Sequence, residues 1–242
     1  MDSAIAGKLI ELNHQFYQTF GGEFSSTRGQ IQPGVRRVLG GLTGNERILD
    51  LGCGNGNLAR ELAQRGHSSS YLGLDFSLPL LQVAESGLDG FPAAFLQGDI
   101  TSDDWDSSLA LSSFDLVFAF AVLHHIPGEE MRLGLLKKIH GLLAPGGRLI
   151  LSNWQFLSSD KLKARIQDWG MVGLSWEQLD DGDYLLDWRA GGAGFRYVHH
   201  FSEDELIALA ASAGFRVVET FRSDGQNHKL GLYQIWEKDS PA

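Results

Sequence analysis

Three aspartates and a run of glycines are the residues of this sequence whose types and spacing point most directly to a binding site. In the segment Asp50-Leu51-Gly52-Cys53-Gly54-Asn55-Gly56, three glycines occupy alternate positions after a short apolar run. Because a glycine has no side chain, its backbone amide can approach a bound ligand closely. Asp75 and Asp99 follow two later apolar runs. We therefore expect all three carboxylates at one edge of a sheet, around a single ligand.

Two kinds of cofactor are compatible with this glycine loop. Gly54, Gly56 and Ala59 satisfy the G-x-G-x-x-A spacing of dinucleotide-binding proteins. Asp75 lies nineteen residues after Gly56, where a carboxylate accepts hydrogen bonds from both ribose hydroxyls of either cofactor. Asp50 argues against a dinucleotide, because its carboxylate would face an anionic pyrophosphate. It suits a second kind of cofactor, one that presents an ammonium group. S-adenosylmethionine is such a ligand.

Asp99 adds an acceptor that an adenine amine can use, and three carboxylates match a cationic nucleoside better than a phosphorylated one. Each aspartate also has a structural interpretation, in which it only caps the helix or turn that follows. Cys53 is interpreted as a small loop residue rather than a nucleophile. Because it is the single cysteine of the chain, an internal disulfide and a multi-cysteine zinc site are excluded, and no metal is expected.

These residues need a scaffold of strands and helices that alternate along the chain. Short apolar runs predict strands at 48–51, 71–74, 95–96, 114–120 and 148–152. Apolar residues at helical spacing predict helices between them, notably at 78–84 and 129–143. Alternation of this kind indicates parallel β-α-β units in an α/β, doubly wound sheet. Two final strands, at 215–221 and 230–237, are expected to be antiparallel.

Two further segments are expected to cover the carboxyl edge of this sheet, all within one domain of residues 1–242. Residues 1–45 form an N-terminal helical cover, because apolar residues recur between 5 and 20 at the spacing of an amphipathic helix. Residues 154–200 form an insertion after the fifth strand that lacks a regular pattern. The insertion holds four tryptophans, which either pack a lid or stack on an acceptor base.

Five segments in this order resemble the Rossmann-like S-adenosylmethionine-dependent methyltransferases, namely residues 48–56, 73–75, 98–99, 114–117 and 143–147. The resemblance implies a seven-stranded, mostly parallel sheet and S-adenosylmethionine as the cofactor. It places the ribose on Asp75, the adenine near Asp99 and Ile100, and the methionyl end close to Phe120 and Ala121. The cofactor-binding residues that it implies are Asp50, Gly52, Gly54, Gly56, Asp75, Phe76, Asp99, Ile100, Phe120 and Ala121.

The acceptor side is harder to define from the residues. Methyl transfer from a sulfonium is an in-line displacement, so the protein mainly aligns donor and acceptor and excludes water. An alcohol or a protonated amine needs a general base, and His124 or His125 is the nearest candidate after the fourth strand. An ionised carboxylate needs none, and a cation such as Arg28 or Arg196 would orient it in a bidentate contact. Of the two histidine rings, one is expected under the sheet edge and one in the pocket.

Four segments resemble a narrower family, the tRNA wobble-uridine methyltransferases that esterify a carboxymethyl group. They are residues 24–28, 121–125, 184–188 and 196–201. This resemblance implies an acceptor pocket for a carboxylate, lined by Arg28, His124, His125, Arg196, Tyr197 and His199. It also implies a tRNA substrate and a small, zinc-binding activator subunit. The chain departs from the family at residues 28–32, which are poorer in aromatic and basic residues.

Charge leaves the acceptor open between a tRNA and a small molecule. The formal net charge of -10 argues against broad nucleic-acid binding, and no DNA partner is expected. Residues 1–40 carry a net charge of +1, whereas residues 41–159 carry -6 and residues 160–242 carry -5. A tRNA contact is therefore expected near Arg28, Arg36 and Arg37 or on a partner protein, rather than across the acidic central domain. A non-catalytic module that binds S-adenosylmethionine is the third possibility.

The sequence also bears on the cellular compartment. Its longest strongly apolar run, residues 116–123, has eight residues, whereas a membrane span needs about twenty. Charged and polar residues interrupt the first twenty positions, which argues against a secretory leader. With a single cysteine, these features favour a cytoplasmic protein without a membrane partner.

Overall fold

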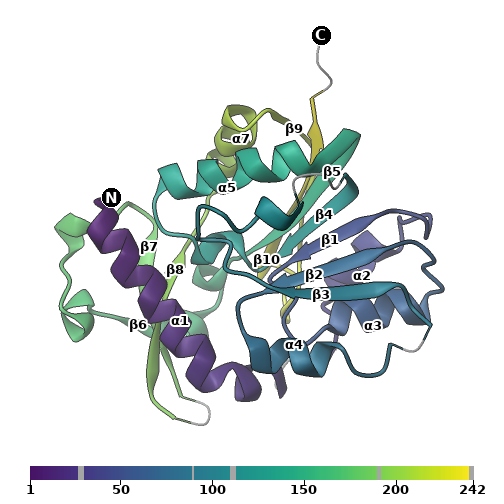
Figure 1. Cartoon of the computed structure of the whole chain (residues 1–242). Helices are drawn as coiled ribbons and strands as arrows, with labels where there is room; N and C mark the ends of the chain where they lie inside the picture. The colour runs from purple at the N-terminus through teal and green to yellow at the C-terminus, as the bar shows by residue number, and fades with distance from the viewer. Residues whose placement is uncertain (27–29, 89, 110–112, 190–191, 240–242) are drawn as a thin grey trace.

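A seven-stranded sheet forms the centre of the protein, in a computed structural model that describes residues 1–26, 30–88, 90–109, 113–189 and 192–239. Its parallel strands are β1 (Ile48–Leu51), β2 (Tyr71–Asp75), β3 (Ala93–Gln97), β4 (Phe114–Phe120) and β5 (Leu143–Trp154). Two antiparallel strands complete it, β9 (Phe215–Ser223) and β10 (Gly231–Lys238). The order β3-β2-β1-β4-β5-β10-β9 confirms the predicted doubly wound sheet with an antiparallel C-terminal hairpin (Figure 1).

Helices cover both faces of this sheet. α5 (Glu129–Leu142) and α7 (Glu203–Ser212) pack on one face, and α2 (Pro33–Leu39) and α3 (Asn57–Gln64) pack on the other (Figure 1). Each helix buries one apolar stripe, which in α3 consists of Leu58, Ala59 and Leu62. The remaining elements near the sheet edge are α4 (Leu78–Ala84) and the 3₁₀ turns η1 (Ser107–Leu109) and η2 (Leu123–His125).

The strand order reverses between β1 and β4, which are neighbours in the sheet although β2 and β3 separate them in the chain. In open α/β sheets, ligands bind in the crevice beyond the carboxyl ends of the strands at such a point. Asp50 lies in β1, Asp75 ends β2, and Asp99 follows the end of β3 by two residues. The topology thus brings the three predicted carboxylates to one edge.

The insertion is more regular than the sequence indicated. It contains a second antiparallel sheet in the order β6-β7-β8, made of β6 (Ile166–Gln167), β7 (Asp183–Trp188) and β8 (Gly194–His199). Its shorter elements are η3 (Phe156–Ser158), α6 (Asp160–Lys163), η4 (Trp169–Val172) and η5 (Trp176–Gln178). The expectation of an irregular segment was wrong, because β7 and β8 pair with each other and are covered on both faces, with Leu185 in one apolar cluster and Leu186 in another.

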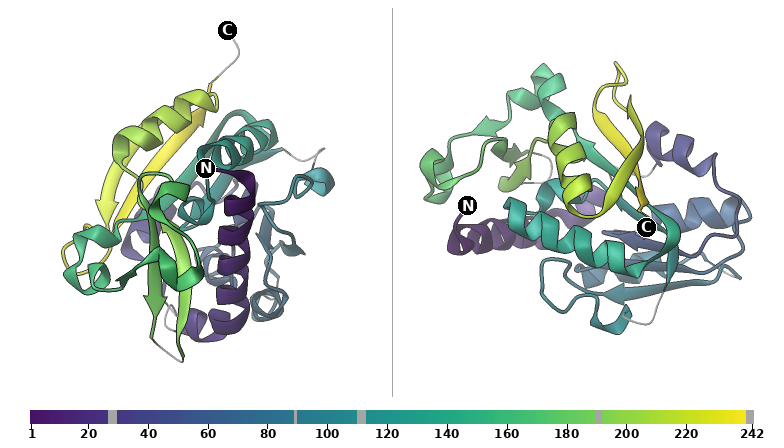
Figure 2. Two further views of the ribbon diagram at one scale, coloured as in Figure 1. Left: turned by 90° about the vertical axis from the view of Figure 1, so that its left-hand side faces the viewer. Right: turned by 90° about the horizontal axis from the view of Figure 1, so that it is seen from above.

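The N-terminal helix α1 (Ser3–Ser26) lies beside this second sheet, and both views of Figure 2 show the two together. A shared apolar cluster joins them, in which Leu9 of α1 packs with Trp169, Leu185 and Tyr197 of the insertion. We call α1 together with residues 154–200 the cap. Trp169 is fully buried in this cluster, as expected of a tryptophan that packs a lid, whereas Trp176 is about half exposed.

The described residues include no helix with the length and apolar character needed to cross a membrane.

Candidate active site

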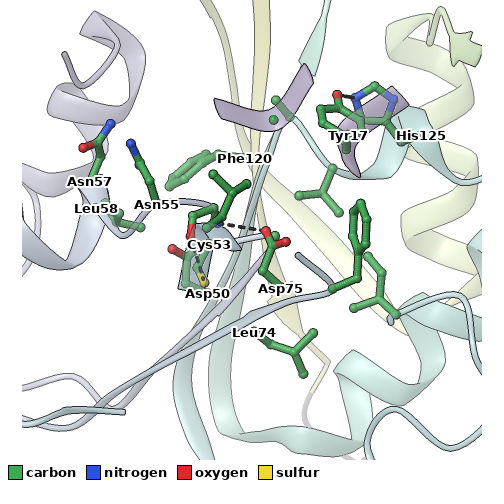
Figure 3. Close-up of a pocket in the computed structure, with 18 of the residues that line it drawn as sticks. Tyr17, Asp50, Cys53, Asn55, Asn57, Leu58, Leu74, Asp75, Phe120 and His125 are labelled. Carbon is green, nitrogen blue, oxygen red and sulfur yellow. Dashed lines mark hydrogen bonds between the residues drawn. The ribbon is translucent and has the colours of Figure 1, made fainter. Parts of the chain in front are cut away.

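A cavity of about 300 Å³ lies at the carboxyl edge of the main sheet (Figure 3). The loops after β1, β2, β3 and β4 form its floor, and α1 of the cap forms part of its wall. Nine of the ten residues predicted to bind the cofactor line it; only Gly56 does not. Four α1 side chains that the sequence analysis did not single out also line it, Ile10, Asn13, His14 and Tyr17.

The glycine loop after β1 adopts a conformation that other residues rarely take. Gly52, Gly54 and Gly56 have φ values of 66°, 56° and 77°, all in the left-handed region. A Cβ atom on Gly52 would lie 2.7 Å from Cγ2 of Val122, whereas one on Gly54 would meet nothing within 4 Å. The loop is therefore packed from behind and open toward the cavity.

Asp75 holds this loop in place. One of its carboxylate oxygens accepts a hydrogen bond from the Gly54 amide at 2.9 Å, and the other accepts one from the Ser77 amide at 2.9 Å. Burial raises the pKa of the Asp75 carboxyl, although the backbone hydrogen bonds oppose that rise. The structural interpretation of Asp75 is thus confirmed, and it is compatible with the functional one, because each oxygen keeps a second lone pair that a ribose hydroxyl could use.

Asp50 is buried beneath the loop, with only 3% of its surface exposed. The Tyr71 hydroxyl donates a hydrogen bond to it at 2.5 Å. Burial raises the pKa of Asp50 to about 7; the Tyr71 hydrogen bond opposes the rise, and the charge of Asp75 adds to it. A nearby cation such as an ammonium group would restore the charged form.

Cys53 is also buried in this loop, and burial raises the pKa of its thiol far above the ordinary value. The thiol therefore stays protonated, in keeping with a small loop residue rather than a nucleophile.

Asp99 faces α1. Its carboxylate accepts hydrogen bonds from the Thr101 amide at 2.9 Å and the Thr101 hydroxyl at 2.7 Å, and it pairs with Nε2 of His14 at 3.2 Å. Burial raises the pKa of Asp99, but the bonds from His14 and Thr101 outweigh it and lower the pKa to about 2. The His14 ring stacks on Phe76 at 4.8 Å between centroids. The cap thus contacts Asp99, which the sequence analysis placed at the adenine end, and Phe76, another of the predicted cofactor-binding residues.

Ala121 forms the far wall where the chain leaves β4. It has a φ of 58°, an unusual value for a residue other than glycine. Its amide donates to the Ser152 carbonyl at 3.0 Å and to the Ser152 hydroxyl at 3.1 Å, which holds the strained turn. This turn directs η2, and with it His125, toward the cavity.

The two histidines of η2 have different surroundings. His125 lines the cavity, with its Nε2 atom 2.8 Å from the Tyr17 hydroxyl and its Nδ1 atom 3.2 Å from the Tyr197 carbonyl oxygen. His124 is 2% exposed, and its Nδ1 atom accepts from the Trp154 amide at 3.4 Å. One ring is packed and one faces the pocket. His125 therefore matches the expectation for the acceptor pocket, whereas His124 is packed behind the wall and does not line the cavity, contrary to what the family resemblance implies.

Arg196 lies one layer behind the cavity wall, on β8. Its guanidinium is buried among the rings of Trp154, Phe16 and Trp188, at 4.8, 5.3 and 5.9 Å from their centroids. Burial lowers the pKa of Arg196, and a hydrogen bond with the Tyr17 side chain opposes that change. Arg196 itself does not line the cavity, but it is hydrogen-bonded to Tyr17, which does.

Tyr197 and His199 differ from the expectation that they line the acceptor pocket, because both point into a buried polar network behind it. The Tyr197 hydroxyl donates to Asp183 at 2.8 Å and accepts from Arg132 at 3.0 Å. His199 lies between carboxylates, 2.7 Å from Asp183 and 2.8 Å from Glu205. The network fastens the insertion to α5 and α7. Arg28, the remaining acceptor candidate, lies outside the described residues.

The protein-family comparison agrees with this geometry. The profile of the family described as methyltransferase domain matches residues 24–220. A candidate methyltransferase of Encephalitozoon cuniculi is 30% identical over 93% of this chain and 94% of its own length. A solved S-adenosylmethionine-dependent methyltransferase of Methanosarcina mazei superposes with a TM-score of 0.65 at 26% identity, covering 86% of this chain and 98% of that one. The chain belongs to the methyltransferase domain family, and its cofactor is S-adenosylmethionine.

Two other relatives carry a substrate in their names. Trans-aconitate 2-methyltransferase of Acidovorax sp. is 42% identical over 42% of this chain. The tRNA (carboxymethyluridine(34)-5-O)-methyltransferase ALKBH8 of Macaca fascicularis is 30% identical over 60% of this chain. The chain spans only 36% and 20% of the lengths of these two proteins.

The residues around the cavity fit this cofactor. The open face of Gly54 leaves room for a ligand against the loop, and three carboxylates around one cavity suit a ligand that carries an ammonium and a sulfonium but no phosphate. Asp75 would hold the ribose, Asp50 the ammonium end and Asp99 the adenine. Bound there, S-adenosylmethionine supplies an electrophilic methyl group.

Proposed function

We propose that this methyltransferase O-methylates a carboxylate, and that the carboxylate belongs to a carboxymethyl group on a tRNA wobble uridine. The observation that carries the carboxylate is the buried Arg196 cation, which is hydrogen-bonded to Tyr17, a residue of the cavity wall. Such a cation favours an anionic acceptor over a neutral amine or alcohol. The ALKBH8 relative supports the tRNA, because its name specifies carboxymethyluridine.

The proposed chemistry asks little of the protein beyond alignment. The acceptor carboxylate oxygen forms a bond to the methyl carbon while the sulfur–methyl bond breaks, and that electron pair stays on sulfur as the thioether. An ionised carboxylate has no proton to lose, so no general base is needed. The cap residues above the cavity exclude water, and the residues around Tyr17 and His125 hold the acceptor in line.

A small carboxylic acid is the second candidate acceptor. Trans-aconitate is a free carboxylic acid, and the enzyme named for it resembles this chain over 102 residues. The net charge of -6 on residues 41–159 also disfavours RNA close to the central domain. In both candidates the acceptor group is a carboxylate. It belongs to a tRNA in the first candidate and to a small molecule in the second.

Labelled S-adenosylmethionine separates the two candidates. The protein is incubated with total tRNA and, in parallel, with a small-metabolite extract, each with and without a cell extract that could supply an activator subunit. We expect label in tRNA, in a carboxymethylated uridine after digestion to nucleosides. Label that appears only in a small acid would favour the second candidate, and label in neither would contradict both.

A further inference from the structure

Tyr17 lies where three parts of the structure meet: α1, the η2 turn and β8. Its side chain lines the cavity next to His125, and Figure 3 shows the two together at one end of it. Its hydroxyl oxygen is 2.8 Å from Nε2 of His125 and is also hydrogen-bonded to Arg196. Arg196 itself does not line the cavity. Tyr17 is thus the group through which the buried cation meets the acceptor space.

The partners of His125 define where the protons lie. Its Nδ1 atom faces the Tyr197 carbonyl oxygen, which can only accept, so Nδ1 carries a hydrogen. In the neutral ring, Nε2 is then an acceptor and the Tyr17 hydroxyl donates to it. In the protonated ring, Nε2 donates to the Tyr17 oxygen, and the Tyr17 hydroxyl can then donate its own hydrogen bond to another acceptor. Arg196 has only donors, so it donates to the Tyr17 oxygen in both cases.

We propose that the Tyr17 hydroxyl is the group that holds the acceptor carboxylate, and that Arg196 is a positioning residue that acts through it. This assignment rests on the proposed function. A carboxylate at the cavity wall accepts a hydrogen bond from the Tyr17 hydroxyl, while His125 in its protonated form and Arg196 both donate to the Tyr17 oxygen. The two cations polarise the Tyr17 hydroxyl in this way, and its single hydrogen bond to the acceptor carboxylate becomes stronger.

A single hydroxyl contact also suits the reaction better than a direct arginine contact. A bidentate guanidinium engages both oxygens of a carboxylate at once. The reaction needs one oxygen with a lone pair directed at the methyl carbon. A contact through Tyr17 holds one oxygen and leaves the other to react, which is the advantage of burying Arg196 behind the wall.

Tyr17→Phe tests this assignment, because it removes the hydroxyl and keeps the ring. The acceptor is total tRNA treated with mild alkali, which hydrolyses carboxymethyl esters to free carboxylates. A hydrogen bond to a charged group contributes enough that KM for this tRNA should rise about 10- to 100-fold in the variant. The affinity for S-adenosylhomocysteine, measured by calorimetry, should not change. Tyr184→Phe is the matched control, since Tyr184 lies on β7 away from the cavity and should keep the wild-type KM.

A double-mutant cycle tests whether Arg196 acts through Tyr17. Arg196→Met keeps an apolar stem among the aromatic rings and removes the charge. If the assignment is correct, Arg196→Met raises KM, and the double variant with Tyr17→Phe is no worse than Tyr17→Phe alone. Additive losses would overturn the positioning role of Arg196.

Three results separate this assignment from the proposed function. A wild-type KM in Tyr17→Phe, with methylation of tRNA intact, overturns the assignment alone. If the wild-type protein methylates trans-aconitate but not tRNA, the same comparison of KM is made with that acid, and a rise supports the assignment. If it methylates neither acceptor, both the proposed function and the assignment fail.

Discussion

Asp50 and Asp75 are neighbouring carboxylates whose surroundings make them chemically different. Asp75 accepts two backbone hydrogen bonds, from Gly54 and Ser77. Asp50 is deeper, accepts from the Tyr71 hydroxyl and has a pKa of about 7. Asp75 is therefore part of the loop scaffold, and we propose it as the ribose acceptor. Burial disfavours the charged form of Asp50, and we propose that the ammonium group of the cofactor restores it.

The raised pKa of Asp50 predicts that cofactor binding depends on pH. Only the ionised carboxylate attracts an ammonium group, so the affinity for S-adenosylhomocysteine should rise about tenfold between pH 6 and pH 8. Calorimetry in two buffers of different ionisation enthalpy should also detect proton release on binding at pH 6. In Asp50→Asn the pH dependence should be much smaller. Equal wild-type affinity at both pH values would contradict this role of Asp50.

The same shift has a consequence for stability. The folded protein holds the Asp50 proton more tightly than the unfolded chain, whose pKa is near 3.8. The contribution of Asp50 to the free energy of unfolding is therefore full below pH 4 and is lost as the pH rises toward 7. Bound cofactor offsets that loss.

Asp75→Ala should abolish cofactor binding by removing two interactions at once. The variant loses the acceptor for both ribose hydroxyls and the bond that fixes the Gly54 amide, so we expect S-adenosylhomocysteine to bind about 100-fold more weakly or not at all. Calorimetry measures this loss. Wild-type affinity in the variant, or equally tight binding of NAD to the wild-type protein, would contradict the assignment.

The residue types of the cofactor side could be predicted because their spacing is local. The glycine loop and Asp75 lie within one β-α-β unit, so their relative position in space can be predicted without knowledge of the rest of the fold. The acceptor side combines Tyr17, His125 and Arg196 from distant parts of the chain, and no sequence spacing relates them. His14 and Tyr17 were missed because they are not among the recurring apolar positions that predicted α1, and that spacing does not show which other residues of the helix line a cavity.

At the scale of elements, the cap is held by contacts with the edge of β8. That strand pairs with β7 on one side only, and α1 covers its other side. Asn13 replaces a neighbouring strand there, because its side-chain oxygen accepts from the Tyr197 amide at 2.8 Å and its nitrogen donates to the Tyr197 carbonyl at 3.2 Å. The second bond of that nitrogen goes to the His125 carbonyl at 3.4 Å. One side chain thus joins α1, β8 and η2.

Asn13→Ala should loosen this junction. The buried Tyr197 amide loses its acceptor, so the free energy of unfolding should fall by about 1–3 kcal/mol. Urea unfolding measures the change, and hydrogen exchange should quicken in α1 more than in the central sheet. Gln15→Ala on the exposed face of the same helix is the control and should have little effect. Equal stability of both variants would show that Asn13 does not hold the cap.

The five parallel strands were predictable because they are apolar runs that alternate with helices, and β9 and β10 because they are apolar runs joined by a polar loop. The second sheet was not, since β7 and β8 acquire their stability from pairing with each other and from α1, which lies far away in the sequence. The runs at 184–188 and 195–199 do carry a strand signal, but it was interpreted as a family motif. The short helix α2 was covered only by the general expectation of an N-terminal helical cover.

At the scale of the whole molecule, charge divides the surface into a small neutral-to-basic segment and a large acidic one. Residues 1–40 carry a net charge of +1 against -10 for the whole chain. Of the two arginines of α2, Arg37 pairs with Glu219 at 2.6 Å and stacks on Phe221, whereas Arg36 is exposed. Residues 30–32 and Val35, next to these arginines, line the cavity. A tRNA that places its wobble base in the cavity would therefore meet Arg36 at the rim.

Arg36→Gln should weaken tRNA binding and lower the slope of log affinity against log salt concentration by about 1. Arg216→Gln is the control. It removes the same charge at the amino end of β9, away from the carboxyl edge that holds the cavity. Arg216 pairs there with Glu237, and the variant should leave tRNA affinity nearly unchanged. Filter binding at several salt concentrations measures both. If both variants bind tRNA as the wild-type protein does, α2 is not part of a tRNA site.

The central claim is that the methyl group goes to a carboxylate oxygen, and the stability of the product in alkali tests it most directly. The protein is incubated with tRNA and S-adenosylmethionine labelled in the methyl group, and the recovered tRNA is treated with mild alkali. A methyl ester hydrolyses under these conditions, so we predict that the label leaves the tRNA as volatile methanol. Label that remains on the nucleoside after this treatment would show transfer to a nitrogen, a carbon or a hydroxyl oxygen, and would contradict the proposed function.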